Sequence, residues 1–151
     1  MNYSRLALAA VAATVVDGVY GFLVYGQVIG SEFARYPAIY RSNETQTAYL
    51  PLMFVGILFA MFVAAYLYAK GYEGGSGMQE GMRFGVLVGL LMVGYVAGVD
   101  YAIMKIGKRM ALYFGLANLV EWTVIGTVIG LVYKPAAASA SGVTSRRAAG
   151  V

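Results

Sequence analysis

Residues 111–133, ALYFGLANLVEWTVIGTVIGLVY, give the clearest indication of the fold. It is apolar apart from Asn118, Glu121 and a few hydroxyl-bearing side chains, and Pro135 follows soon after it. At about 1.5 Å per residue, a helix of this length crosses a hydrocarbon layer of about 30 Å. Three more apolar runs precede it, at about residues 6–29, 49–69 and 84–106. We therefore predict an all-α fold, an integral membrane bundle of four transmembrane helices within residues 1–135.

The composition favours a membrane protein and excludes much chemistry. Hydrophobic residues make up 60% of the chain and charged residues 12%, whereas soluble domains carry about 25% charged residues. Cysteine and histidine are absent, which excludes disulfides, thiol chemistry, histidine-based catalysis and most zinc sites. No other nucleophile and base stand at a convincing spacing. We predict a non-enzymatic protein with no catalytic residue, metal or cofactor.

The net charge of +4 is spread over the ends of the predicted spans. This distribution favours the lipid bilayer as partner and argues against nucleic acid. An even number of spans places both termini on the same side of the membrane, and the basic residues weakly favour the cytoplasmic side. We expect the bacterial inner membrane as the location.

The connections between the spans differ in character. Residues 30–48 form the longest one, and its aromatic residues Phe33, Tyr36 and Tyr40 are expected at the lipid–water interface. The glycine-rich residues 71–81 read as a flexible linker, because they lack the GxxxxGK[ST] pattern of a phosphate loop. The short third connection predicts an antiparallel hairpin of the last two helices. Residues 136–151 are small and polar, which predicts a disordered tail.

Three acidic residues fall inside the predicted spans: Asp17, Asp100 and Glu121. A carboxylate at mid-bilayer costs at least about 2.5–3.5 kcal/mol and therefore usually faces the bundle interior. Asp17 and Glu121 lie near the middle of their spans, whereas Asp100 lies near the end of its span. Asn118 is one helical turn from Glu121, and these four residues form the candidate intramembrane polar site.

Two interpretations of this polar site remain open. No basic residue lies at the depth of Asp17 and Glu121, so at least one of them is expected to be neutral. Protonatable carboxyl groups at mid-membrane suit a proton-coupled transporter. Alternatively, the carboxyl groups hydrogen-bond to neighbouring polar side chains and only hold helices together.

Glycine pairs at GxxxG spacing predict close helix contacts. The third span contains Gly85–Gly89 and, on the opposite face, Gly94–Gly98, so we expect it to contact two neighbours and to be central. The fourth span contains Gly126–Gly130 on the face away from Glu121. That face is expected to contact another helix of the chain, or a second copy in a homo-oligomer.

Three segments give the chain a distinctive order: FARYPAIYR (33–41), YEGGSGMQEGMRFGVLVG (72–89) and NLVEWTVIGTVIGLVYKP (118–135). Over about residues 1–135 this order resembles small four-helix bacterial membrane proteins grouped as domains of unknown function. The resemblance implies a four-helix membrane fold and brings no reaction, cofactor or site residue. In its helix count and its acidic first helix, where Asp17 lies, the chain is also similar in design to small multidrug transporters.

We expect a non-enzymatic accessory or structural component of a membrane, alone, as a homo-oligomer or within a membrane complex. The alternative function is a small proton-coupled transporter that uses the intramembrane carboxylates.

Overall fold

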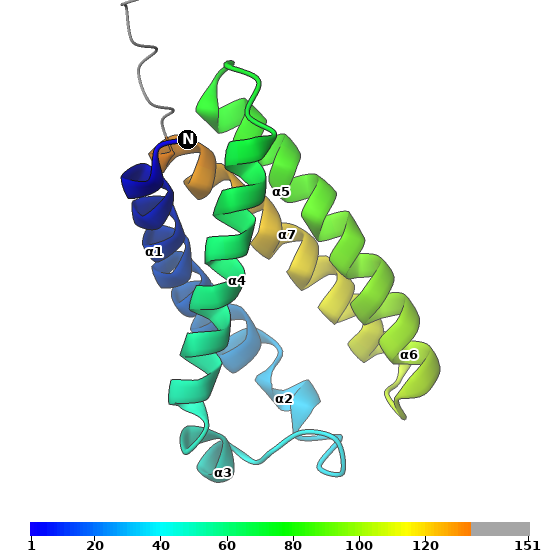
Figure 1. The fold of residues 1–151 in the computed structure, drawn as a ribbon. Helices are drawn as coiled ribbons and strands as arrows, with labels where there is room; N and C mark the ends of the chain where they lie inside the picture. The colour runs from blue at the N-terminus through cyan, green and yellow to red at the C-terminus, as the bar shows by residue number, and fades with distance from the viewer. Residues whose placement is uncertain (134–151) are drawn as a thin grey trace, which may run out of the picture.

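The computed structural model describes residues 1–133, and every regular element in that range is helical (Figure 1). Four helical segments are long and apolar enough to cross a membrane: Tyr3–Val28, Leu50–Lys70, Gly77–Ile103 and Lys108–Val132. The predicted all-α class and the number of apolar helices are confirmed. The tail predicted at residues 136–151 lies outside the described residues.

The first and third of these segments each contain a π-helical stretch. The elements in chain order are α1 (Tyr3–Tyr20), the π-helix η1 (Gly21–Val28), α2 (Gly30–Phe33), α3 (Asn43–Thr47), α4 (Leu50–Lys70), α5 (Gly77–Val93), the π-helix η2 (Gly94–Val99), α6 (Asp100–Ile103) and α7 (Lys108–Val132). A π-helix bonds residue i to i+5, so its turns are wider than those of an α-helix. Each stretch therefore changes which side chains share a face.

The third span begins at Gly77, not near residue 84 as predicted. The residues before 84 are polar, so hydropathy alone does not detect them. The Glu80 carboxylate accepts hydrogen bonds from the backbone N–H groups of Glu73, at 3.2 Å, and Gly75. Gly74 has a φ of 92°, which glycine adopts without strain. These features turn the chain directly into α5, so the linker is shorter than predicted.

Helix α7 is central in the bundle (Figure 1). It packs on α5 along one face and on α1 along another, while α1 also packs on α4. The prediction that the third span is central is therefore wrong. An added Cβ at Gly94 or Gly98 would find no atom within 4 Å. The third span thus uses only one of its two glycine faces within residues 1–133.

The contact between α5 and α7 is built on glycine. Every fourth residue at the start of α5 is a glycine, and these residues are Gly77, Gly81, Gly85 and Gly89. An added Cβ on Gly81 would collide with the Gly126 carbonyl oxygen, and one on Gly77 would collide with that of Gly130. The two backbones therefore touch. Of the predicted pairs, Gly85 meets Gly126 across this antiparallel hairpin, while Gly89 packs on Leu119 and Gly130 on Gly77 and Gly81.

The connection at residues 30–48 folds back onto the start of α7. Its aromatic side chains Phe33, Tyr36 and Tyr40 pack against a buried cluster of Ile106, Met110 and Ala111. The hydroxyl of Tyr36 also accepts a hydrogen bond from the Gly107 backbone N–H at 3.0 Å. These aromatic residues thus contact protein, and their depth in a membrane stays a prediction.

We expect Tyr36→Phe to lower the free energy of unfolding by about 0.5–1.5 kcal/mol, because the Gly107 N–H loses its acceptor. Thermal unfolding of the full chain in detergent measures this loss. The matched control is Tyr3→Phe, since Tyr3 is 72% exposed and should lose nothing. Equal melting temperatures for the two variants would contradict the prediction.

Candidate functional site

The candidate site is centred on two carboxyl groups from different spans. Asp17 lies in α1 and Glu121 in α7, and their carboxyl groups lie close enough to interact. Glu121 is only 8% exposed, and Asp17 is partly buried. A carboxylate can only accept hydrogen bonds, so a bond between two carboxyl groups needs a proton on one of them. The pair is therefore a candidate proton-binding site.

A tyrosine and an asparagine extend this pair into a network. The Tyr25 hydroxyl, in η1, donates to Oε2 of Glu121 at 2.8 Å. The side-chain amide of Asn118 donates to the Tyr25 hydroxyl oxygen at 3.2 Å and to the carbonyl oxygen of Phe114 at 3.0 Å. The hydrogen bonds thus run from Asn118 through Tyr25 to Glu121, which lies beside Asp17.

A second tyrosine fixes the first span against α7 beside the network. The Tyr20 hydroxyl donates to the carbonyl oxygen of Ala117 at 2.8 Å. Its ring meets the Tyr25 ring edge-on, with the centroids 6.0 Å apart. This contact holds the first span in the register that brings Asp17 to Glu121.

No cation neutralises the pair within the described part of the chain. The ion pairs found among residues 1–133 both involve Glu32. Glu121 is therefore held by the Tyr25 hydroxyl and by its proximity to Asp17, while the Asn118 amide acts through Tyr25. This arrangement fits a site that gains and loses a proton rather than a permanent ion pair.

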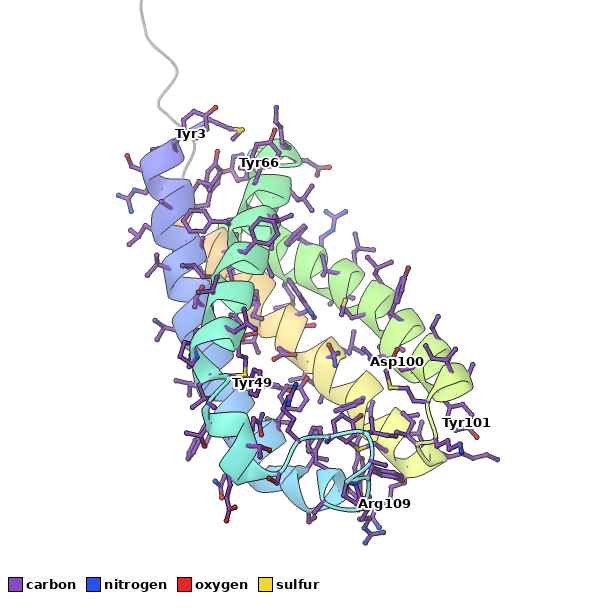
Figure 2. All side chains as sticks on the ribbon, turned by 60° about the horizontal axis from the view of Figure 1, so that its bottom comes forward. Tyr3, Tyr49, Tyr66, Asp100, Tyr101 and Arg109 are labelled. Atoms are coloured by element: carbon purple, nitrogen blue, oxygen red, sulfur yellow. The ribbon has the colours of Figure 1, made fainter. Side chains whose placement is uncertain are left out.

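The structure brings together Asp17, Asn118 and Glu121 but leaves Asp100 apart. Asp100 begins α6, near the end of the bundle that also carries Arg109 (Figure 2). Its charge faces the connection at residues 30–48, where burial and then the charge of Asp100 raise the pKa of Tyr40. Asp100 thus lies near Tyr40 and outside the carboxyl site.

Sequence reasoning missed Tyr25 because of the π-helical stretch. On a regular α-helix, positions 17 and 25 are about 80° apart around the axis. The wider turns of η1 begin at Gly21 and rotate each residue by less, which returns Tyr25 to the side of Asp17. Tyr20 lies on the face predicted for Asp17.

Glu32 was also missed, although it is the most buried charged side chain described. It is 2% exposed, and its Oε1 lies 3.0 Å from Nη2 of Arg109 and 3.6 Å from Nε of Arg35. The sequence places Glu32 in a polar connection, where exposure is the usual expectation. Only its i, i+3 spacing to Arg35 hinted at an ion pair.

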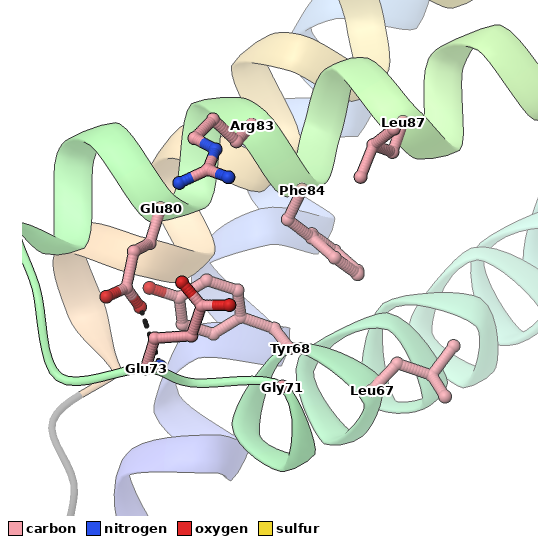
Figure 3. Close-up of a pocket in the computed structure, with 8 residues that line it drawn as sticks. All are labelled: Leu67, Tyr68, Gly71, Glu73, Glu80, Arg83, Phe84 and Leu87. Carbon is pink, nitrogen blue, oxygen red and sulfur yellow. Dashed lines mark hydrogen bonds between the residues drawn. The ribbon is translucent and has the colours of Figure 1, made fainter.

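A cavity of about 160 Å³ between α4 and α5 is a less suitable site (Figure 3). Its charged lining residues are Glu73, Glu80 and Arg83, near the turn between the two helices. The Glu80 carboxylate is occupied by the backbone of that turn. The cavity therefore belongs to the turn that starts α5.

Residues 1–133 contain no group of three or more His, Cys, Asp or Glu side chains placed to hold a metal ion. No protein-family model matches the chain, and no curated protein sequence or solved structure is detectably similar to it. The resemblance to small four-helix bacterial membrane proteins stays a prediction. The side chains of the candidate site are therefore the basis for the proposed function.

Proposed function

We propose that the chain is an integral membrane protein that works as a small proton-coupled transporter, with no enzymatic activity. The observation that supports this proposal is the close approach of the Asp17 and Glu121 carboxyl groups, with the Tyr25 hydroxyl bonded to Glu121. Each residue lies near the middle of a segment long enough to span a membrane. Carboxyl groups at that depth are costly and typically mark proton or substrate pathways.

The hydrogen bonds around the pair suit both of its protonation states. The Tyr25 hydroxyl donates to Glu121 and can also rotate to accept from it. The amide of Asn118 keeps the Tyr25 oxygen satisfied in either case. Loss of a proton from Glu121 therefore leaves this carboxylate with the Tyr25 hydroxyl as donor, which lowers the cost of proton exchange.

A flux measurement on Asp17→Asn tests the transporter proposal. In liposomes with an imposed pH gradient, we expect this variant to fall to the proton leak of empty liposomes, because an amide does not exchange a proton as a carboxyl does. The matched control is Asp100→Asn, which changes an acidic residue outside the network and should keep wild-type flux. A wild-type protein without flux above empty liposomes, or an Asp17→Asn variant with wild-type flux, would refute the proposal.

The second candidate is a non-enzymatic accessory or structural membrane component, the function that the sequence alone favours. Its support is the exposure of the third span. In the apolar 18-residue window of this span, a share of only 6% is buried inside the structure. Leu87, Leu91 and Tyr95 are more than 60% exposed on this span. Mild extraction followed by native mass spectrometry separates the two candidates. A stable larger complex without proton flux favours the second, and flux from the purified chain favours the first.

We also propose that both ends of the described chain face the cytoplasm in a bacterial inner membrane. The N-terminus and the last turn of α7 lie at the same end of the bundle (Figure 1). The native chain has no cysteine, so single cysteines report topology cleanly. We expect Gly75→Cys and Ala48→Cys to react with impermeant thiol reagents from opposite sides of the membrane. Labelling from the same side would contradict the four-span arrangement.

A further inference from the structure

A groove between η1 and α7 combines a charged end with an apolar floor. It encloses about 350 Å³ and is lined at one end by Ser31, Glu32, Arg109 and Tyr113. Along its length it is lined mainly by Val24, Val28, Leu116 and Val120. Between Tyr113 and Val120, α7 rises by about 10 Å. The groove therefore has the polarity of an amphiphile, with one polar end and an apolar stem.

The charged end is built around Arg109, which Figure 2 labels. The buried Glu32 carboxylate lies 3.0 Å from Nη2 of Arg109, and Nε of Arg109 donates to the Tyr113 hydroxyl at 3.1 Å. Its guanidinium carbon also lies 5.3 Å from the centre of the Tyr113 ring. These contacts leave further N–H donors on a side chain that is 60% exposed. Arg109 thus presents a cation to a ligand in this groove.

The charge balance at this end is positive. Glu32 contributes one negative charge, while Arg35 and Arg109 both lie within 4 Å of it and contribute one positive charge each. One positive charge is left over, with Lys108 exposed next to Arg109 in the chain. The groove therefore favours an anionic polar group at this end.

The apolar part of the groove is open to its surroundings. Val28, Leu116 and Val120 are 74%, 63% and 53% exposed. All three belong to segments long enough to span a membrane. In a bilayer, the molecules that cover such side chains are lipids.

We propose that this groove binds an anionic phospholipid, with the lipid phosphate on Arg109 and an acyl chain along Val28, Leu116 and Val120. Basic pockets between transmembrane helices are typical sites for anionic headgroups. The inference rests on the proposed membrane insertion but not on proton transport. Ala117, whose carbonyl accepts the Tyr20 hydroxyl, also lines the groove. The bound lipid would therefore stabilise the helix contact that positions the carboxyl pair.

Native mass spectrometry of the full chain in detergent tests the charged end, with dioleoyl phosphatidylglycerol and dioleoyl phosphatidylcholine as probes. We expect wild type to retain the phosphatidylglycerol about fivefold better, the factor that one cation near an anionic lipid contributes. Arg109→Gln alone would leave Glu32 buried with its closest cation removed and could unfold the chain. We therefore compare two variants. Glu32→Gln should keep the preference for phosphatidylglycerol, and the double variant Glu32→Gln/Arg109→Gln should lose it.

Three controls make the test decisive. Arg83→Gln removes an arginine at the other cavity and should leave the preference unchanged. Leu116→Ser with Val120→Ser should weaken retention of both lipids, because the acyl chain loses its contacts. Inorganic phosphate should not displace phosphatidylglycerol, and displacement would indicate an anion site without a lipid groove. Unchanged preference in the double arginine–glutamate variant would overturn the proposal, whether or not the protein transports protons.

Discussion

Replacement of Gly85 by alanine is expected to separate α5 from α7 and to destabilise the protein by at least about 3 kcal/mol, the upper end of the usual range for overpacked cores. The added Cβ would collide with the Trp122 carbonyl oxygen and lie 2.9 Å from Cα of Thr123. Both are backbone atoms, which cannot rotate out of the way. The two helices must therefore move apart, and the neighbouring glycine contacts are lost with them.

The matched control is Gly94→Ala in the same span. A Cβ there meets no atom within 4 Å, and Gly94 has φ −57° and ψ −41°, which alanine adopts without strain. We expect this variant to be neutral or to gain up to about 1 kcal/mol. Chemical unfolding of the full chain in detergent, followed by Trp122 fluorescence, measures both. If the two variants unfold at the same denaturant concentration, the close backbone contact does not exist.

The glycine contacts show how far the sequence could predict packing. Spacing alone identified Gly85–Gly89 and Gly126–Gly130, because backbones approach closely only where side chains are absent. It failed for the second face because a glycine pair does not show whether a neighbouring helix covers it, and none contacts Gly94 or Gly98 within residues 1–133. Beyond Gly89, Ala97 takes up the contact, since an added Cβ on Gly115 would lie 3.1 Å from its Cβ. The π-helix η2 begins at Gly94, and no spacing rule available from one sequence predicts it.

The carboxyl site shows the same limit. Depth in the span singled out Asp17 and Glu121, and helical spacing added Asn118. To predict the partner of Glu121, one must know which helices are neighbours. Hydropathy does not show which spans pack together. Tyr25 needed the wider turns of η1, and the burial of Glu32 arises only when α2 folds onto the start of α7. Local patterns therefore predicted which residues are costly to bury. They did not predict which residues supply the hydrogen-bond or ion-pair partners of those residues.

A large effect on proton flux is expected when Glu121 is replaced by glutamine. In Glu121→Gln, the amide N–H₂ can donate toward Asp17 and the amide oxygen can accept from Tyr25, as the protonated carboxyl group does. We expect this variant to fold with a change in unfolding free energy below about 1 kcal/mol. Its proton flux in liposomes should fall to the leak of empty liposomes. Wild-type flux in Glu121→Gln would show that protons do not pass through this carboxyl group.

Glu121→Leu separates a buried site from an exposed one, because leucine has similar bulk and no hydrogen-bonding group. The Tyr25 hydroxyl would lose its acceptor and Asp17 its carboxyl partner, so we expect a loss of about 1–3 kcal/mol in unfolding free energy. Thermal unfolding of wild type, Gln and Leu variants side by side measures the difference. A purely structural role predicts a destabilised Leu variant and a Gln variant that matches wild type in every assay, flux included. A Leu variant as stable as wild type would mean that Glu121 faces lipid headgroups or water, in which case the polar network cannot hold α1 against α7.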